Sequence, residues 1–279
     1  MITLPQGPGP IGVFDSGYGG LTILQGIRRL MPEYDFIYLG DNARTPYGTR
    51  SFDVVYEFTR QAVLYLFRQG CHLVVLGCNT ASAKALRTIQ QHDLPNIDPS
   101  RRVLGIIIPT AEVIGQLTKT RHVGILATEG TIRSGSYEME IHKRYPDIQV
   151  TGEACPMWVP LVENNEAESE GASYFVKKNM DRLMARDKDI DTIILGCTHY
   201  PILMPMIERH LKPGVTVVRQ GDYVARSLSD YLTRHPEMDD CCSKNGNVRY
   251  LTTESADKFS ENAQQFLQER VEVECICLG

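Results

Sequence analysis

Residues 73–86 read LVVLGCNTASAKAL, and residues 192–206 read TIILGCTHYPILMPM. Each stretch has an apolar run, a Gly-Cys pair, a polar turn and then a helix-like pattern. A short apolar run that breaks into a turn before a helix is typical of a buried strand in an α/β sheet. Open α/β sheets bind ligands at the carboxyl ends of their strands. The pattern therefore predicts that Cys78 and Cys197 lie where a ligand would bind.

A second pair of similar stretches precedes these two. IGVFDSG (Ile11–Gly17) resembles VGILATEGT (Val123–Thr131), since each is an apolar strand that ends in a small, polar turn. The order and approximate spacing repeat, because 66 positions separate Gly12 from Cys78 and 73 separate Gly124 from Cys197. The repeat predicts an α/β fold of two pseudo-symmetric lobes, each a mostly parallel sheet flanked by helices, with the active site between them.

No low-complexity linker divides the chain. We place the first crossing near Ile108-Pro109 and the return near Arg219-Gln220, each just after an apolar strand pattern. The first lobe would comprise residues 1–108, completed by 220–279, and the second residues 109–219. Within the first lobe, Thr22 and Ser51 are predicted N-caps, and Gly70 should end the helix that Ser51 begins.

Charge and hydropathy exclude several classes of protein. The 279 residues include 29 basic and 34 acidic side chains, a net charge of −5, so no footprint for nucleic acid is visible. No apolar run approaches the roughly 20 residues that a bilayer span needs. The start of the chain lacks the basic and apolar regions of a secretory signal. We expect a cytoplasmic protein that does not enter the membrane.

Eight cysteines are too few for a disulfide scaffold in a chain of this length. Four lie in or beside strand-like segments and are expected to be buried structural thiols: Cys71, Cys155, Cys275 and Cys277. Cys241 and Cys242 lie in a polar stretch that predicts an exposed, mobile loop. We assign no function to these six.

Cys78 and Cys197 suggest acid–base chemistry. A helix N-terminus lowers the pKa of a thiol and attracts carboxylates, so each position favours a thiolate beside a carboxylate substrate. Inversion of a stereocentre needs a base on one face of the carbon and an acid on the other. Two lobes with one thiol each would supply both. The chain has no glycine-rich phosphate cradle with a matching lysine, so we expect neither a nucleotide nor a pyridoxal cofactor.

Five motifs occur in order: IGVFDSGYGGLTIL, DNARTPYG, GCNTASA, ACPMWVPLVE and GCTHYP. They closely resemble the glutamate racemases of the aspartate/glutamate racemase superfamily, from Ile11 to about Arg226. The resemblance implies a two-lobed α/β fold and interconversion of L- and D-glutamate without a cofactor. It also implies a role in supplying D-glutamate for bacterial peptidoglycan.

The resemblance also implies roles for individual residues. Cys78 would remove the proton from D-glutamate and Cys197 the proton from L-glutamate, with Asp15, His199 and Glu163 as auxiliary acid–base groups. Asp15 and His199 would also contact the substrate. The other implied substrate-binding residues are Ser16, Pro46, Tyr47, Gly48, Asn79, Thr80, Thr128, Thr131 and Thr198.

Other interpretations stay open. The two cysteines could be structural thiols, Asp15 and Ser16 a helix-capping turn, and His199 and Glu163 solvated surface groups. No C-x-x-C or H-x-x-x-H spacing supports a metal site. The alternatives in function are an aspartate or other amino-acid racemase, a non-catalytic amino-acid-binding module and a thiol redox protein. A homodimer is the default assembly.

Overall fold

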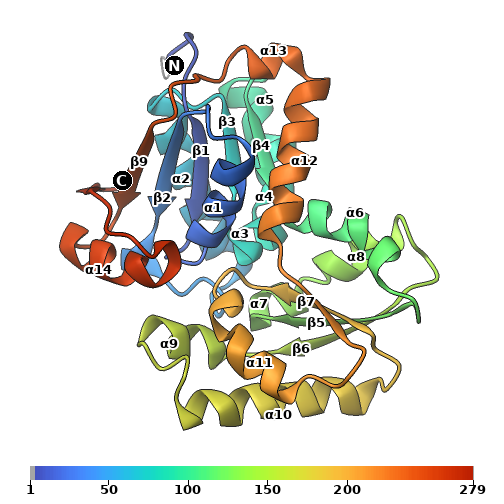
Figure 1. The fold of residues 1–279 in the computed structure, drawn as a ribbon. Coiled ribbons are helices and arrows are strands. Elements are labelled where there is room, and N and C mark those ends of the chain that lie inside the picture. The colour runs from blue at the N-terminus through green and yellow to red at the C-terminus, as the bar shows by residue number, and fades with distance from the viewer. Residues whose placement is uncertain (1–3, 279) are drawn as a thin grey trace.

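The computed structural model describes residues 4–278, which form two lobes (Figure 1). The strands are β1 (Ile11–Asp15), β2 (Phe36–Gly40), β3 (Leu73–Leu76), β4 (Arg102–Gly105), β5 (His122–Ala127), β6 (Gln149–Ala154), β7 (Thr192–Gly196), β8 (Thr216–Val218), β9 (Val248–Thr252) and β10 (Val273–Cys275).

The first lobe and the crossings hold the helices α1 (Leu21–Leu30), α2 (Phe52–Arg68), α3 (Asn79–Lys84), α4 (Leu86–Thr88), α5 (Leu94–Ile97), α6 (Ile107–Leu117), α12 (Gly221–Arg234), α13 (Pro236–Asp239) and α14 (Ala256–Leu267). The second lobe holds α7 (Glu129–Arg133), α8 (Ser136–His142), α9 (Trp158–Glu163), α10 (Glu170–Arg186) and α11 (Met204–His210). Short helical turns are η1 (Asn42–Arg44), η2 (Ile89–Asp93) and η3 (Tyr200–Leu203).

Each lobe is built on one parallel sheet. The strand orders are β10-β9-β2-β1-β3-β4 in the first lobe and β6-β5-β7-β8 in the second. The segment β2-β1-β3-β4 has the same order as β6-β5-β7-β8, and every pairing is parallel. The predicted α/β fold with two related lobes is confirmed.

The shared order also determines where a ligand would bind. In each sheet, the first strand along the chain lies between the second and the third. The connection from the first strand to the second therefore runs toward one edge of the sheet, and the chain then returns to place the third strand on the other side of the first. Such a switch point opens a crevice at the carboxyl ends of the strands. The crevices lie between β1 and β3 and between β5 and β7, next to Cys78 and Cys197.

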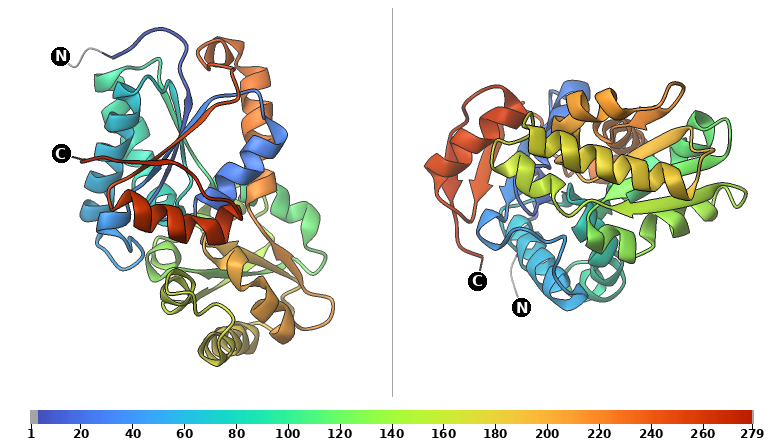
Figure 2. Two further views of the ribbon diagram at one scale, coloured as in Figure 1. Left: turned by 60° about the vertical axis from the view of Figure 1, so that its left-hand side comes forward. Right: turned by 90° about the horizontal axis from the view of Figure 1, so that it is seen from below.

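Helices cover both faces of the six-stranded sheet, with α2 on one side and α12 on the other (Figure 2). All five residues of β1 are buried, with Ile11 and Val13 facing one apolar cluster and Phe14 facing the other. A strand covered on both faces is apolar throughout, and this accounts for the unbroken hydrophobic run at the start of the chain.

The chain passes between the lobes twice. After β4 it enters α6, and after β8 it returns through Gln220 into α12. The final strands β9 and β10 then extend the six-stranded sheet beyond β2. The first lobe is thus completed by the last segment of the chain.

The predicted N-cap and helix end are confirmed at α2, whereas the predicted N-cap of α1 is wrong. The Ser51 hydroxyl accepts a hydrogen bond from the Val54 N–H at 3.4 Å, and Gly70, with φ of +92°, follows the end of α2. Helix α1 begins instead at Leu21 after Gly20, with no side-chain cap. Thr22 donates to the carbonyls of Gly19 and Thr198, at 2.8 and 3.3 Å, because its hydroxyl faces the other lobe.

Three expectations about the peripheral cysteines are wrong. Cys275 and Cys277 are exposed, because they lie on and beyond the edge strand β10. Cys242 is buried, because helix α13 folds part of its polar stretch and the Met238 carbonyl accepts from the Cys242 thiol at 3.3 Å. Among residues 4–278, no helix combines the length and apolar character needed to cross a bilayer.

Candidate active site

A cavity of about 130 Å³ opens between the two lobes, and Cys78 and Cys197 both line it. Turns from both sheets form its walls. Eleven of the residues that the sequence singled out are among its lining: Ser16, Pro46, Tyr47, Gly48, Cys78, Asn79, Thr80, Thr128, Cys197, Thr198 and His199. The cavity therefore brings together side chains that lie more than 180 positions apart in the sequence.

Cys78 follows β3 and is the N-cap residue of α3. Its sulfur accepts a hydrogen bond from the Ala81 N–H at 3.5 Å and lies 3.4 Å from the Ser16 hydroxyl. The helix start was expected to lower the pKa of this thiol. Burial instead raises the pKa of Cys78 to about 12, and the nearby Asp15 carboxylate adds to the increase. Two weak hydrogen bonds do not offset the loss of water around a thiolate.

Cys197 follows β7, but no α-helix begins there. The chain first forms η3, and α11 begins at Met204. The sulfur of Cys197 lies 3.9 Å from His199 Nδ1, and His199 Nε2 lies 3.0 Å from Glu163 Oε1. A histidine, and not a helix terminus, is the charged neighbour of this thiol.

His199 is buried and held between two partners. Burial alone would lower the pKa of His199, but its hydrogen bonds to Cys197 and Glu163 and their charges outweigh burial and raise it to about 10. The imidazole is then protonated at neutral pH and donates from both nitrogens. A buried positive charge therefore lies beside the Cys197 sulfur.

Asp15 ends β1 and lies below the cavity surface. Its carboxylate accepts from the Gly17 N–H at 2.8 Å and from the Thr198 hydroxyl at 3.4 Å. Burial raises the pKa of Asp15, while the His199 charge opposes that increase. Asp15 thus connects the Cys78 side of the cavity with the turn that carries Cys197.

Gly19 allows the two lobes to approach closely at this point. A Cβ on Gly19 would lie 2.3 Å from Thr198 Oγ1 and 2.5 Å from His199 Nδ1. Any side chain would displace the turn after Cys197. Gly19 therefore brings the first lobe into direct contact with the turn that follows Cys197 in the second.

Three threonines form a hydroxyl cluster at the other end of the cavity. The Thr80 hydroxyl lies 3.0 Å from that of Thr128 and 3.4 Å from that of Thr131. Thr128 is also the N-cap of α7, accepting from the Thr131 N–H at 3.3 Å. Thr131, Asp15 and Glu163 are not among the cavity-lining residues of the described chain; each contacts residues that are.

The PYG loop closes a third side. The Tyr47 hydroxyl donates to Asp41, and the Gly130 N–H donates to the Gly48 carbonyl at 2.8 Å. The Lys84 ammonium donates to the Arg50 carbonyl at 2.6 Å. The loop, which belongs to the first lobe, is thereby joined to α7 of the second.

Several lining residues were not expected: Thr45, Thr49, Glu129, Cys155, Pro156, Val159 and Pro160. All seven are sequence neighbours of expected residues or lie in the ACPMWVPLVE motif, and that proximity was the available signal. Cys155 was predicted to be only a structural thiol. No lysine or arginine within residues 4–278 lines the cavity, so hydroxyl, amide and backbone N–H groups are its hydrogen-bond donors.

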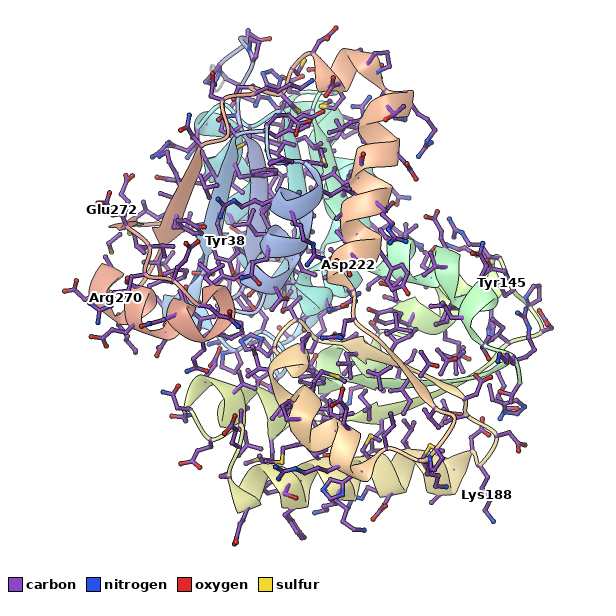
Figure 3. All side chains as sticks on the ribbon, viewed as in Figure 1. Tyr38, Tyr145, Lys188, Asp222, Arg270 and Glu272 are labelled. Atoms are coloured by element: carbon purple, nitrogen blue, oxygen red, sulfur yellow. The ribbon has the colours of Figure 1, made fainter. Side chains whose placement is uncertain are left out.

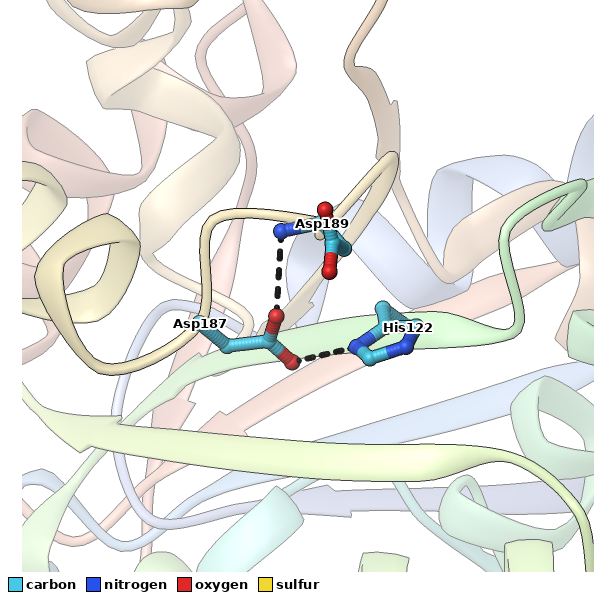
Figure 4. A group of neighbouring side chains, drawn as sticks. All are labelled: His122, Asp187 and Asp189. Atoms are coloured by element: carbon cyan, nitrogen blue, oxygen red, sulfur yellow. Dashed lines mark hydrogen bonds and ion pairs between the residues drawn. The ribbon is translucent and has the colours of Figure 1, made fainter.

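A second group of titratable side chains lies away from the cavity, at the start of β5 (Figure 4). His122 Nδ1 lies 2.8 Å from Asp187 Oδ2, and the Asp189 N–H donates to Asp187 Oδ1 at 3.0 Å. These bonds join the end of α10 to the sheet. They satisfy the Asp187 carboxylate without an ion, so we treat the group as a structural contact.

The fold and site together define a class of enzyme: a two-lobed α/β protein with one thiol from each lobe at a shared cavity. A family model described as Asp/Glu/Hydantoin racemase matches residues 20–228. The chain belongs to this racemase family. Its relatives include a glutamate racemase from Ruegeria sp. (strain TM1040), 38% identical over 95% of this chain and 98% of that protein.

Solved structures give the same family. A glutamate racemase isoform from Bacillus anthracis superposes with a TM-score of 0.88 at 34% identity, covering 97% of this chain and 98% of that one. A glutamate racemase from Francisella tularensis, solved in complex with D-glutamate, gives 0.85 at 32% identity, again over 97% and 98% of the two chains.

Proposed function

We propose that this protein interconverts L- and D-glutamate by direct proton transfer, without a cofactor. The observation that carries the proposal is the shared cavity, to which the two lobes contribute one sulfur each. The relatives named above, which are similar over nearly their whole length, are called glutamate racemases. Substrate and chemistry are therefore supported by separate observations.

Within one turnover the proton transfers balance between these two groups, and proton exchange of both thiols with water restores the starting state before the next turnover. With L-glutamate, the Cys197 thiolate takes the α-proton and becomes a thiol, leaving a carbanion stabilised by its carboxylate. The Cys78 thiol then delivers its proton to the opposite face and becomes a thiolate, which gives D-glutamate. With D-glutamate, the same steps run in reverse from a Cys78 thiolate.

The electrostatic surroundings support this division of roles. The raised pKa of Cys78 keeps its proton in place at neutral pH, as a proton donor requires. The protonated His199 places a positive charge beside Cys197, the sulfur that the proposal assigns as the base toward L-glutamate. The two carboxylates act on these groups indirectly. Asp15 lies near Cys78 and raises the pKa of that thiol, and Glu163 contacts His199 at the nitrogen that faces away from Cys197.

The hydroxyl and amide groups of the cavity hold the substrate in the proposal. Ser16, Asn79 and Thr198 lie beside the two sulfurs, and Thr80 and Thr128 lie with the threonine cluster. Positioned neutral donors stabilise charge that develops on a carboxylate when the α-carbon loses its proton. Such donors take the place of the iminium group that a pyridoxal enzyme would supply.

The test incubates L-glutamate in deuterium oxide with the wild type and with Cys78→Ser and Cys197→Ser. We expect the wild type to form D-glutamate that carries one solvent deuterium at the α-carbon. Each serine variant should lose most racemisation, because serine is a far weaker acid than cysteine. Cys275→Ser, at an exposed position outside the cavity, is the matched control and should remain fully active.

Three results would refute parts of the proposal. Preference for aspartate in a substrate panel would identify a different racemase of the family. Binding of glutamate with no deuterium incorporation would indicate an amino-acid-binding module. A Cys78–Cys197 disulfide after mild oxidation, found by mass spectrometry in a protein without racemase activity, would indicate redox function.

We also propose a cytoplasmic location, because a two-thiol mechanism needs reduced cysteines, which that compartment maintains. The D-glutamate would supply peptidoglycan synthesis, as the resemblance implies. A homodimer remains the prediction for assembly, on the general frequency of twofold symmetric oligomers. Sedimentation equilibrium measures it directly.

A further inference from the structure

Gln220 lies at the return crossing between the lobes, immediately before α12, and is only 3% exposed. Asp222, two residues further on, is labelled where the lobes meet in Figure 3. The Gln220 amide has four polar contacts, three at its nitrogen and one at its oxygen, and the two hydrogens on the nitrogen are shared among its three contacts. Its Nε2 lies 3.1 Å from the Ile106 carbonyl, 2.9 Å from Thr110 Oγ1 and 2.7 Å from the Tyr137 hydroxyl, and its Oε1 lies 2.7 Å from Asn79 Nδ2.

One of these partners fixes the orientation of the amide. A backbone carbonyl can only accept, so the nitrogen of Gln220, and not its oxygen, must face Ile106. The Gln220 oxygen then faces Asn79, and it can only accept. Asn79 must therefore present its own nitrogen to Gln220.

The orientation of Asn79 follows in turn. Its Nδ2 donates one hydrogen to Gln220, and its Oδ1 accepts from the Tyr137 hydroxyl at 2.7 Å. The second hydrogen on Nδ2 has no partner assigned among these contacts, and Asn79 lines the cavity directly after Cys78. With the amide reversed, the cavity would receive an oxygen where it now receives a donor.

Tyr137 extends the network to the second thiol. Its ring packs against the end of β7, where a Cβ on Gly196 would lie 3.2 Å from Tyr137 Cε2. Gly196 directly precedes Cys197. Burial raises the pKa of Tyr137, so its hydroxyl keeps the proton that it donates to Asn79. The network thus touches both Gly-Cys turns as well as both crossings.

We propose that Gln220 is a positioning residue for racemisation, which holds the Asn79 amide so that its free N–H donates to the substrate carboxylate. The inference rests on the proposed function, since it needs a carboxylate in the cavity. Gln220 does not itself touch the substrate. Gln220 contacts residues at both crossings between the lobes. The orientation of Asn79 therefore depends on how the two lobes are arranged.

Gln220→Met tests the inference, because methionine has a similar length but no amide. Negative charge on the carboxylate grows as the α-proton leaves, so a lost donor weakens the transition state more than the bound substrate. We expect kcat/KM to fall about tenfold or more in both directions, with most of the loss in kcat.

A double-mutant cycle with Asn79→Ala separates positioning from general damage. If Gln220 acts through Asn79, adding Gln220→Met to Asn79→Ala should change kcat/KM by less than about twofold. Multiplicative losses would show that Gln220 acts by another route and would overturn the inference. So would wild-type kinetics in Gln220→Met.

Two further variants guard against misfolding. Thr110→Val removes one Gln220 contact and leaves the Asn79 bond, so its kinetics should stay within about twofold of the wild type. Tyr137→Phe removes the hydroxyl that orients Asn79 from the other side, and it should reproduce the same cycle if Gln220→Met does not fold. Failure of the wild type to racemise glutamate would refute the proposed function itself. That result is distinguishable from a failure of the Gln220 inference, in which the wild type is active and only the behaviour of the variants differs.

Discussion

The two cavity thiols have nearly the same exposure, 6% for Cys78 and 7% for Cys197, but different charged neighbours. Cys78 lies near the Asp15 carboxylate, which raises the pKa of that thiol, whereas Cys197 lies beside a protonated His199. Access to the two sulfurs is therefore similar, whereas the charges beside them have opposite signs.

This asymmetry predicts selective alkylation. At pH 7, iodoacetamide should modify Cys197 at least about tenfold faster than Cys78, because burial and Asp15 keep Cys78 as an unreactive thiol, whereas Cys197 has the His199 imidazolium beside it. Mass spectrometry of digested protein, sampled over time, measures both rates in one experiment. Replacing His199 with glutamine should reduce the difference. Faster modification of Cys78 would contradict the expectation that Cys197 is the more reactive of the two thiols.

His199 also makes stability depend on pH. The pKa of His199 is about 10 in the folded protein against an ordinary value of 6.5, so between these pH values the folded state holds a proton that the unfolded chain has lost. The stabilisation is complete below about pH 6.5 and disappears as pH rises toward 10, at no more than about 1.4 kcal/mol per pH unit.

The measurement compares thermal unfolding of the wild type and His199→Gln from pH 6 to pH 10. The difference in melting temperature should be largest at pH 6 and should shrink steadily as pH rises. A difference that stays constant, or grows, would show that His199 is neutral in the folded protein.

Sequence patterns located the sulfur atoms but not their ionisation. Cys78 and Cys197 were predicted at the cavity because a strand followed by a turn is a local pattern. The pKa of Cys78 depends on burial and on Asp15, which is far from it in sequence, and that information is not local. Gln220 and Tyr137 had no signal at all, because their partners come from both crossings and both lobes.

At the scale of elements, the parallel strands were predictable because unbroken apolar runs identify them. The helix expected after Cys197 was not found, and two prolines explain the difference. Pro201 lies in the first turn of η3, and Pro205 has no N–H to donate to the Pro201 carbonyl four residues earlier. A continuous α-helix is therefore broken, and α11 begins anew at Met204.

The PYG loop lines the cavity and contacts α7 of the second lobe through Gly48. A Cβ on Gly48 would lie 2.8 Å from the Thr128 Cβ, so Gly48→Ala should push the loop away from α7. We expect the KM for glutamate to rise about tenfold, because small displacements of substrate-holding groups are costly. The melting temperature should change little.

Steady-state kinetics in both directions measure this effect, and Gly7→Ala provides the matched control. Nothing lies within 4 Å of a Cβ at Gly7, which is exposed and far from the cavity. The control should leave both KM and kcat unchanged. An unchanged KM in Gly48→Ala would mean that the loop does not approach the substrate.

At the scale of the whole molecule, one of the apolar clusters extends across both lobes. A single cluster of buried side chains contains Ile11 of β1 and Val224 of α12 together with Trp158 of α9 and Leu195 of β7. Side chains in one packed cluster lose their contacts together. Two lobes joined in this way should not unfold independently, although each has its own sheet.

The chain has one tryptophan, and this makes the idea testable. Trp158 is fully buried in the second lobe, where its indole N–H donates to Asn179 at 3.1 Å. In urea, its fluorescence reports that lobe alone, whereas far-ultraviolet circular dichroism reports both. We expect coincident transitions with one midpoint, since a two-state process gives the same curve for every probe. Different midpoints for the fluorescence and dichroism transitions would mean that the two lobes unfold separately. The two sulfurs would then lie on separately folding units, and contacts other than the shared apolar cluster would have to hold the cavity together.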